Sequence, residues 1–191
     1  WLPHMLGHEG TGIIIDTGPS VRKVSIGDEV ILTWIQCNGL DAVPARFKYK
    51  KTFVNSGKVT TFSNYSIISE NRVVKKPKKM SLKVASLYGC AFPTGAGMVI
   101  NDLKFKKSDF VLILGLGGIG MSSLIALKAS GHKNIIALDT SDTKLRIAAK
   151  MGVKFTLNAR NKFKSDFYKI TGCGADYCIE SAGTTQSIEL G

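Results

Sequence analysis

With 191 residues, of which 44% are hydrophobic and 21% charged, the chain has the composition of a folded globular protein and not of a disordered one. Its 26 basic and 14 acidic residues give a formal net charge of +12, a balance that admits nucleic acid or an acidic membrane surface as partner. The densest basic run, residues 75–79, is interrupted by proline and lacks flanking aromatic residues that stack on bases, so we interpret it as a solvated turn and expect neither partner.

The first half of the chain is predicted to be rich in β-structure. Glycine turns flank the apolar run in GTGIIIDTG, and a second apolar run, EVILTWI, follows Asp28. Residues 36–60 are polar and irregular, and we interpret them as a surface excursion. Ser81 stands where an N-cap would begin a short helix that ends near Leu87. The predicted strands of this half are 10–18, 28–35, 61–69 and 72–75.

The second half changes to strands that alternate with helices. Residues 110–127 carry no charge over 18 positions, so a membrane span has to be considered, but the glycines at their centre would break a lone spanning helix. A buried strand, a turn and a helix explain this run better. Strands that alternate with helices form βαβ units, so we predict an α/β fold with a parallel sheet that begins after 92–97. The predicted strands are 110–114, 134–139, 154–158 and 175–180, and the predicted helices are 118–130, 142–151 and 162–171.

Residues 115–120, GLGGIG, fit the pattern G-x-G-x-x-G between an apolar strand and a helix. In that context Gly115 allows the tight turn, and Gly117 lets a pyrophosphate approach the backbone. Gly120 lets helix and strand pack closely, and the helix N-terminus offers free N–H groups to the phosphates. The loop therefore predicts a dinucleotide site. The alternative is a Rossmann-like sheet that binds another nucleotide, or none.

Asp139 ends the next predicted strand, 19 residues after Gly120. A carboxylate in this position accepts hydrogen bonds from the hydroxyl groups of the adenosine ribose. It also repels a 2′-phosphate, so the sequence favours NAD over NADP as the coenzyme.

His8 and Cys90 are candidate metal ligands. The four cysteines are widely spaced and contain no CxxC pair, which is typical of reduced thiols or metal ligands rather than of a disulfide framework. His8 lies beside Glu9, between glycines and ahead of a predicted strand, but a lone histidine is more often an ordinary surface or core residue. Cys90 can equally be a buried thiol, because a long separation gives no zinc signature. No signal peptide opens the sequence, and we expect a cytoplasmic protein.

Four segments together resemble the zinc-containing medium-chain alcohol and polyol dehydrogenases. The family's GHE segment is similar to PHMLGHEGTGIIIDTG in this chain, and its GD-x-V strand is similar to SIGDEVIL. GCAFPTGAG resembles its second zinc-cysteine segment, and VLILGLGGIG with IIALD resembles its coenzyme domain. They occur in family order over almost the whole chain. The resemblance implies part of a GroES-like catalytic domain over 1–93, with its start missing, and a Rossmann domain over 94–191, with its last strands missing.

The resemblance also assigns roles to single residues. It implies that His8 and Cys90 ligate one catalytic zinc ion, and that Glu9 lies beside the metal as an exchangeable ligand. It places Thr94 against the nicotinamide and Lys144 on the adenosine ribose. The end of the strand within 176–183 would border the coenzyme. The implied coenzyme-binding residues are Thr94, Gly115, Gly117, Gly118, Ile119, Gly120, Asp139 and Lys144.

The implied function is hydride transfer between an alcohol or polyol and NAD, in a homodimeric or homotetrameric enzyme that acts on a small alcohol or carbonyl compound. Two alternatives remain: a zinc-free quinone or enoyl reductase of the same superfamily, and a non-catalytic relative that binds nucleotides or nucleic acid. The family's third zinc ligand is a cysteine upstream of the GHE segment. We therefore expect a piece of a longer chain that is inactive alone. Only Cys37 falls within 36–60, so we expect no structural zinc.

Overall fold

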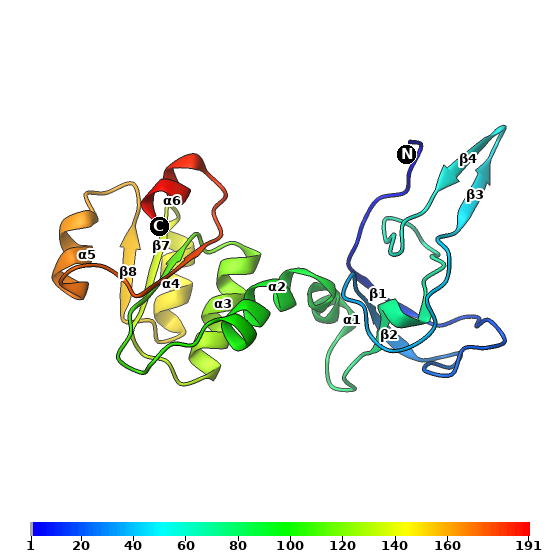
Figure 1. The fold of residues 1–191 in the computed structure, drawn as a ribbon, viewed down its shortest axis with the longest axis horizontal. Coiled ribbons are helices and arrows are strands. Elements are labelled where there is room, and N and C mark those ends of the chain that lie inside the picture. The colour runs from blue at the N-terminus through cyan, green and yellow to red at the C-terminus, as the bar shows by residue number, and fades with distance from the viewer. Residues whose placement is uncertain (1) are drawn as a thin grey trace. The chain divides into compact units, whose positions relative to one another are not determined.

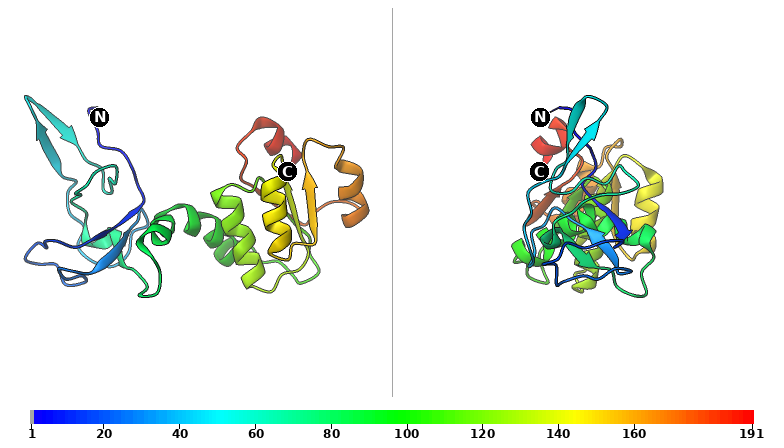
Figure 2. Two further views of the ribbon diagram at one scale, coloured as in Figure 1. Left: turned by 180° about the vertical axis from the view of Figure 1, so that it is seen from behind. Right: turned by 90° about the vertical axis from the view of Figure 1, so that its right-hand side faces the viewer.

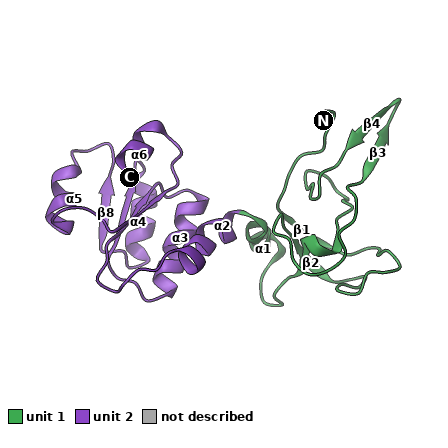
Figure 3. Ribbon diagram, viewed as in Figure 1, with its two compact units in different colours: residues 1–90 green, residues 91–191 purple. Residues whose placement is uncertain are grey.

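The computed structural model describes residues 2–191, which divide into two compact units, residues 1–90 and 91–191 (Figures 1 and 3). The first unit holds the strands β1 to β5, and the second holds a parallel sheet with helices on both faces. This is the α/β architecture with a β-rich first half that the sequence predicts. In residues 2–191 no helix has the length and apolar character needed to cross a membrane.

The first unit is built on an antiparallel sheet in the order β1-β2-β5. Its strands are β1 (Gly10–Ile13), β2 (Glu29–Leu32) and β5 (Val73–Lys75). Alternate residues of a strand point to opposite faces, so Val30 and Leu32 enter the same core, together with Val73 of the neighbouring strand. After β5 come the short helix α1 (Leu82–Ala85) and the 3₁₀ turn η2 (Ser86–Gly89). The side chain of Ser81 accepts the Val84 N–H at 3.3 Å, which confirms it as the N-cap of α1.

Two predictions for the first unit are wrong. The stretch 36–60 is not wholly irregular, because β3 (Arg46–Tyr49) and β4 (Thr52–Asn55) form a hairpin whose turn holds Lys50 at a positive φ of 54°. Residues 61–69, predicted as a strand, form none. Serine and threonine hydroxyls bond to the local backbone here, as when the Ser66 hydroxyl donates to the Thr60 carbonyl at 2.5 Å. Such local bonds compete with a strand ladder.

Glu70, in the 3₁₀ turn η1 (Glu70–Arg72), links three loops of the first unit and is only 7% exposed. Its Oε2 accepts the backbone N–H of Leu40 at 2.8 Å, and its Oε1 accepts those of Lys23 and Arg22 at 2.6 Å each. These bonds hold the pKa of Glu70 below its usual value, and the bond from Leu40 has the largest effect.

We expect Glu70→Gln to lower the free energy of unfolding of the first unit at neutral pH. Because the folded-state pKa is lowered, the stabilisation is fully present above the unfolded pKa, about 4.3, and is lost as the pH falls through the folded value. The difference between wild type and variant therefore shrinks in acid. Urea unfolding followed by tryptophan fluorescence measures it, since both tryptophans lie in residues 1–90. Asp16→Asn, at an exposed carboxylate, is the control; equal losses at both positions contradict the prediction.

The second unit contains a four-stranded parallel sheet in the order β8-β7-β6-β9. Alternate residues of β6 enter two different cores: Val111 and Ile113 pack with residues of α3 and α4, and Leu112 and Leu114 pack with residues of α5 and α6. Figure 2 shows α4 and α5 on opposite sides of this sheet. The strands are β6 (Val111–Leu114), β7 (Ile135–Asp139), β8 (Phe155–Asn158) and β9 (Tyr177–Glu180). The helices are α2 (Ala91–Gly97), the π-helical turn η3 (Met98–Asp102), α3 (Gly118–Ala129), α4 (Asp142–Lys150), α5 (Lys164–Thr171) and α6 (Thr185–Leu190).

Candidate functional site

The glycine loop lies at the carboxyl end of β6, where the chain turns into α3. Gly115 has a φ of 87°, in the left-handed region, and an added Cβ there would come within 2.9 Å of Ala182. Gly117 is the N-cap of α3 and supplies no side chain to the N–H groups of the first helical turn. An added Cβ at Gly117 would meet nothing within 4 Å, whereas one at Gly120 would overlap the carbonyl oxygen of Gly115. The loop thus leaves open space in front of free N–H groups while its base is tightly packed.

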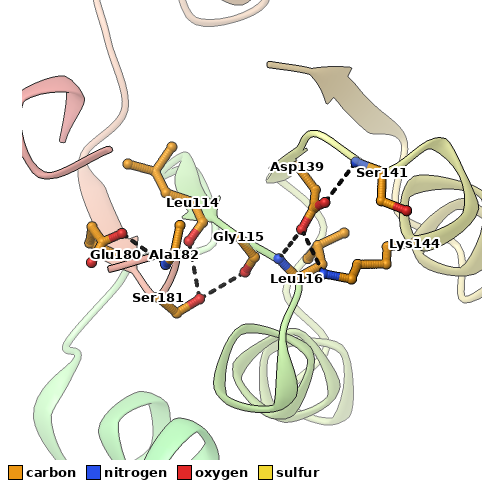
Figure 4. Close-up of polar contacts among 9 residues, drawn as sticks. All are labelled: Leu114, Gly115, Leu116, Asp139, Ser141, Lys144, Glu180, Ser181 and Ala182. Carbon is orange, nitrogen blue, oxygen red and sulfur yellow. Dashed lines mark hydrogen bonds and ion pairs between the residues drawn. The ribbon is translucent and has the colours of Figure 1, made fainter. Parts of the chain in front are cut away.

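Asp139 lies at the carboxyl end of β7, beside this loop (Figure 4). Its Oδ2 accepts the N–H of Leu116 at 2.6 Å and lies 3.5 Å from the Lys144 ammonium, and its Oδ1 accepts the N–H of Ser141 at 2.8 Å. Burial acts to raise the pKa of Asp139, but the two N–H groups and the ammonium outweigh it and hold the pKa below its usual value. The carboxylate is therefore ionised, oriented and next to the glycine loop.

The end of β9 completes this edge of the sheet. The Ser181 hydroxyl is placed to donate to the carbonyl of Gly115 at 2.7 Å and to that of Leu114 at 3.1 Å. The Glu180 carboxylate accepts the N–H groups of Ala182 and Gly183 at 2.8 and 2.9 Å. The resemblance placed this strand end near the coenzyme, but sequence reasoning did not single out Ser181. The serine after an apolar strand, in ESAG, was its only signal.

His8, Glu9 and Cys90 all belong to the first unit. His8 is exposed, Glu9 is half-buried just before β1, and Cys90 is half-buried directly after η2. The two segments meet at Gly89: an added Cβ there would lie 3.0 Å from the Glu9 Cβ and would overlap the Leu32 carbonyl. The structure therefore brings the backbone of Glu9 against the residue that precedes Cys90, although these segments are far apart in the sequence.

Two threonines hold these segments in place. The Thr61 hydroxyl donates to the Glu9 carbonyl at 2.8 Å, and the buried Thr33 hydroxyl donates to the Gly89 carbonyl at 2.7 Å. Imidazole and thiolate are donors that zinc prefers, so the chemistry of His8 and Cys90 fits this metal. Within residues 2–191 no three His, Cys, Asp or Glu side chains are grouped so as to hold a metal ion. His8 and Cys90 therefore stay predicted ligands, whose convergence on one ion the described residues do not test.

Thr94, Gly118 and Ile119 belong to the second unit. Thr94 lies on α2 and is exposed, and Gly118 and Ile119 open α3 with exposed surfaces. α2 packs on α3, where the hydroxyl of Ser123 donates to the Gly95 carbonyl at 3.0 Å. The residues expected to bind the coenzyme thus lie at the start of α3, on the adjoining α2, at the ends of β6 and β7 and, for Lys144, on α4.

Comparison with known families decides what these two units are. The family model described as "Alcohol dehydrogenase GroES-like domain" matches residues 1–78, and the one described as "Zinc-binding dehydrogenase" matches residues 118–191. The chain belongs to the medium-chain dehydrogenase/reductase family. The resemblance inferred from the four segments is confirmed.

Among the relatives of this chain is alcohol dehydrogenase 6 of Peromyscus maniculatus, which is 30% identical over 98% of the chain and 57% of the relative. Benzyl alcohol dehydrogenase of Acinetobacter calcoaceticus is 29% identical with a TM-score of 0.82, over 100% of the chain and 58% of that structure. An alcohol dehydrogenase zinc-binding domain protein of Burkholderia ambifaria is 28% identical with a TM-score of 0.82, over 98% of the chain and 58% of that structure. The chain spans just over half the length of the relatives it matches.

Proposed function

We propose that this medium-chain dehydrogenase transfers hydride between an alcohol or polyol and NAD in a reaction that depends on one zinc ion. The observation that carries the proposal is the oriented carboxylate of Asp139 beside an open glycine loop at a helix N-terminus. The named alcohol dehydrogenases among its relatives support the substrate class. We further propose that the protein is cytoplasmic and homo-oligomeric and that it binds neither nucleic acid nor membrane.

The proposed binding of NAD follows from the N–H groups at the start of α3, the open space at Gly117 and the carboxylate of Asp139. The N–H groups at the start of α3 attract the pyrophosphate, and the open space at Gly117 lets it come close. Asp139 accepts the ribose hydroxyls, for which its carboxylate still has free lone pairs. The Lys144 side chain is 45% exposed and forms only a 3.5 Å ion pair with Asp139, so it is free to contact the ribose as well. Thr94 on α2 would contact the nicotinamide ring.

The metal half of the proposal assigns His8 and Cys90 as zinc ligands, with Glu9 beside them as an exchangeable ligand. Bound zinc is a Lewis acid that lowers the pKa of an alcohol and polarises a carbonyl group. Two threonines hold the backbone at and beside two of these residues. Thr61 holds the carbonyl of Glu9, and Thr33 holds the carbonyl of Gly89. The coenzyme-binding unit holds the hydride acceptor.

We expect Asp139→Asn to abolish the preference for NAD over NADP. The wild-type chain should bind NAD at least tenfold more tightly than NADP, because a buried carboxylate repels the 2′-phosphate. The neutral amide removes that repulsion and weakens the bonds to the ribose, so the two affinities converge. Calorimetric titration of the chain with each nucleotide measures the ratio. Asp142→Asn, at an exposed position of α4, is the matched control and should keep the preference. Equal wild-type affinities would remove Asp139 from coenzyme selection.

A zinc-free quinone or enoyl reductase of the same family remains the alternative. It predicts turnover of an activated double bond or a quinone with NADH or NADPH, and no dependence on His8 or Cys90. Assaying both substrate classes with and without a chelator separates the two functions.

A further inference from the structure

One peptide group in the glycine loop forms hydrogen bonds through both its carbonyl oxygen and its N–H. The carbonyl oxygen of Gly115 accepts the Ser181 hydroxyl at 2.7 Å, and the N–H of the same peptide, on Leu116, donates to Asp139 Oδ2 at 2.6 Å. Figure 4 shows the series Ser181, Gly115, Leu116, Asp139 spanning the carboxyl ends of β9, β6 and β7. The Gly115–Leu116 peptide, one residue before Gly117, is thereby fixed in orientation.

The Ser181 hydroxyl and the Asp139 carboxylate polarise this peptide in the same direction. A donor on the carbonyl oxygen increases the polarity of the peptide, which strengthens the bond from its N–H to a carboxylate. Charge-assisted bonds such as that from Leu116 to Asp139 are the stronger kind, and the low exposure of Asp139, 8%, limits competition from water. Losing the Ser181 hydroxyl would remove the first bond, weaken the second and let the peptide rotate about the flexible Gly115.

Ser181 is itself held rigidly. Its backbone N–H donates to the Leu114 carbonyl at 2.9 Å, which continues the pairing of β9 with β6. Beyond it, the Glu180 carboxylate closes the turn by accepting the N–H groups of Ala182 and Gly183. An added Cβ at Gly120 would lie 2.5 Å from the Ser181 Oγ, so the hydroxyl sits where strand, loop and helix converge.

We propose that Ser181 is a positioning residue for the coenzyme: its hydroxyl holds the Gly115–Leu116 peptide in the orientation with which the glycine loop accepts the pyrophosphate. The inference rests on the proposed function, because it concerns the same NAD site. It adds a residue directly after β9 to a site whose other proposed contacts come from α2, α3, α4 and the ends of β6 and β7.

The test compares Ser181→Ala with Ser130→Ala in the whole chain. Ser130 also donates its hydroxyl to a backbone carbonyl, that of Ala126 at 2.9 Å, but at the far end of α3. We expect Ser181→Ala to weaken NAD and ADP-ribose about three- to tenfold, the effect of one lost hydrogen bond. Adenosine, which lacks the pyrophosphate, should lose less than twofold, and Ser130→Ala should bind all three ligands as wild type does. Ser181→Cys, with a weaker donor of similar size, should fall in between.

A second readout follows the peptide itself. The amide proton of Leu116, in a short bond to a carboxylate, should resonate far downfield in the NMR spectrum of the unliganded chain and move upfield in Ser181→Ala only. Unchanged NAD affinity in Ser181→Ala, or equal losses for NAD and adenosine, overturns the positioning role. A wild-type chain that does not bind NAD overturns the proposed function and this inference with it, whereas wild-type binding with an unaffected variant refutes the inference alone.

Discussion

Gly120→Ala should prevent the second unit from folding stably. The new methyl group would overlap the Gly115 carbonyl oxygen and crowd the Ser181 hydroxyl, and neither is the end of a flexible side chain. Forcing α3 away from β6 disturbs the core around Ile113 and Leu124, so we expect a loss of at least about 2 kcal/mol in the free energy of unfolding. Thermal unfolding followed by circular dichroism measures the loss, and NAD binding should disappear with the fold.

Gly117→Ala is the matched control from the same loop. Gly117 has ordinary φ and ψ values of −75° and −167°, and its added Cβ would meet nothing within 4 Å. The free energy of unfolding of the variant should therefore lie within about 0.5 kcal/mol of the wild-type value. Its methyl group would nevertheless occupy the space proposed for the pyrophosphate, so NAD affinity should fall at least tenfold. If Gly117→Ala binds NAD normally, the pyrophosphate does not lie on this loop.

His8→Ala and Cys90→Ser should each lower turnover of the whole enzyme about a thousandfold or more. The reason is that loss of a metal ligand removes a Lewis acid whose stabilisation of the transition state is several kcal/mol. The affinity for NAD should change less than threefold, because the residues proposed to bind the coenzyme lie in the other unit. Steady-state kinetics, zinc analysis and NAD titration together separate these effects.

Control variants for this prediction come from the same unit. His4→Gln and Cys37→Ser remove an imidazole and a thiol to which no metal role is assigned, and both variants should retain zinc and turnover. Wild-type rates in His8→Ala or Cys90→Ser would remove zinc from the mechanism. Equal loss of activity in the controls would show that the first unit tolerates no change at these residue types.

Much of the fold could be predicted because its signals are local and strong. Four uncharged residues of β6 are followed at once by the glycines and by α3, and this order allows only a strand, a turn and a helix. Asp139 was predicted to accept the ribose hydroxyls because it ends the strand that follows the glycine loop. In the structure it accepts the Leu116 N–H of that loop.

The sequence-based predictions are wrong where the pattern of hydrophobic residues is weak or misleading. The hairpin of β3 and β4 carries three lysines and one arginine, so its apolar residues Phe47 and Val54, which pair across the strands, were not recognised as strand residues. The stretch 61–69 alternates as a strand would, but its hydroxyl groups bond locally and to the Glu9 carbonyl. The role of Ser181 depends on a contact across 66 residues of sequence, which no local pattern reveals.

The most direct test of the account is to measure NADH formation by the whole enzyme from an alcohol and NAD, before and after removal of metal by a chelator. The account predicts that NADH absorbance rises with alcohol, that the rise is lost after chelation, and that zinc restores it. Unchanged NADH formation in the metal-free enzyme would contradict zinc-dependent hydride transfer at His8 and Cys90.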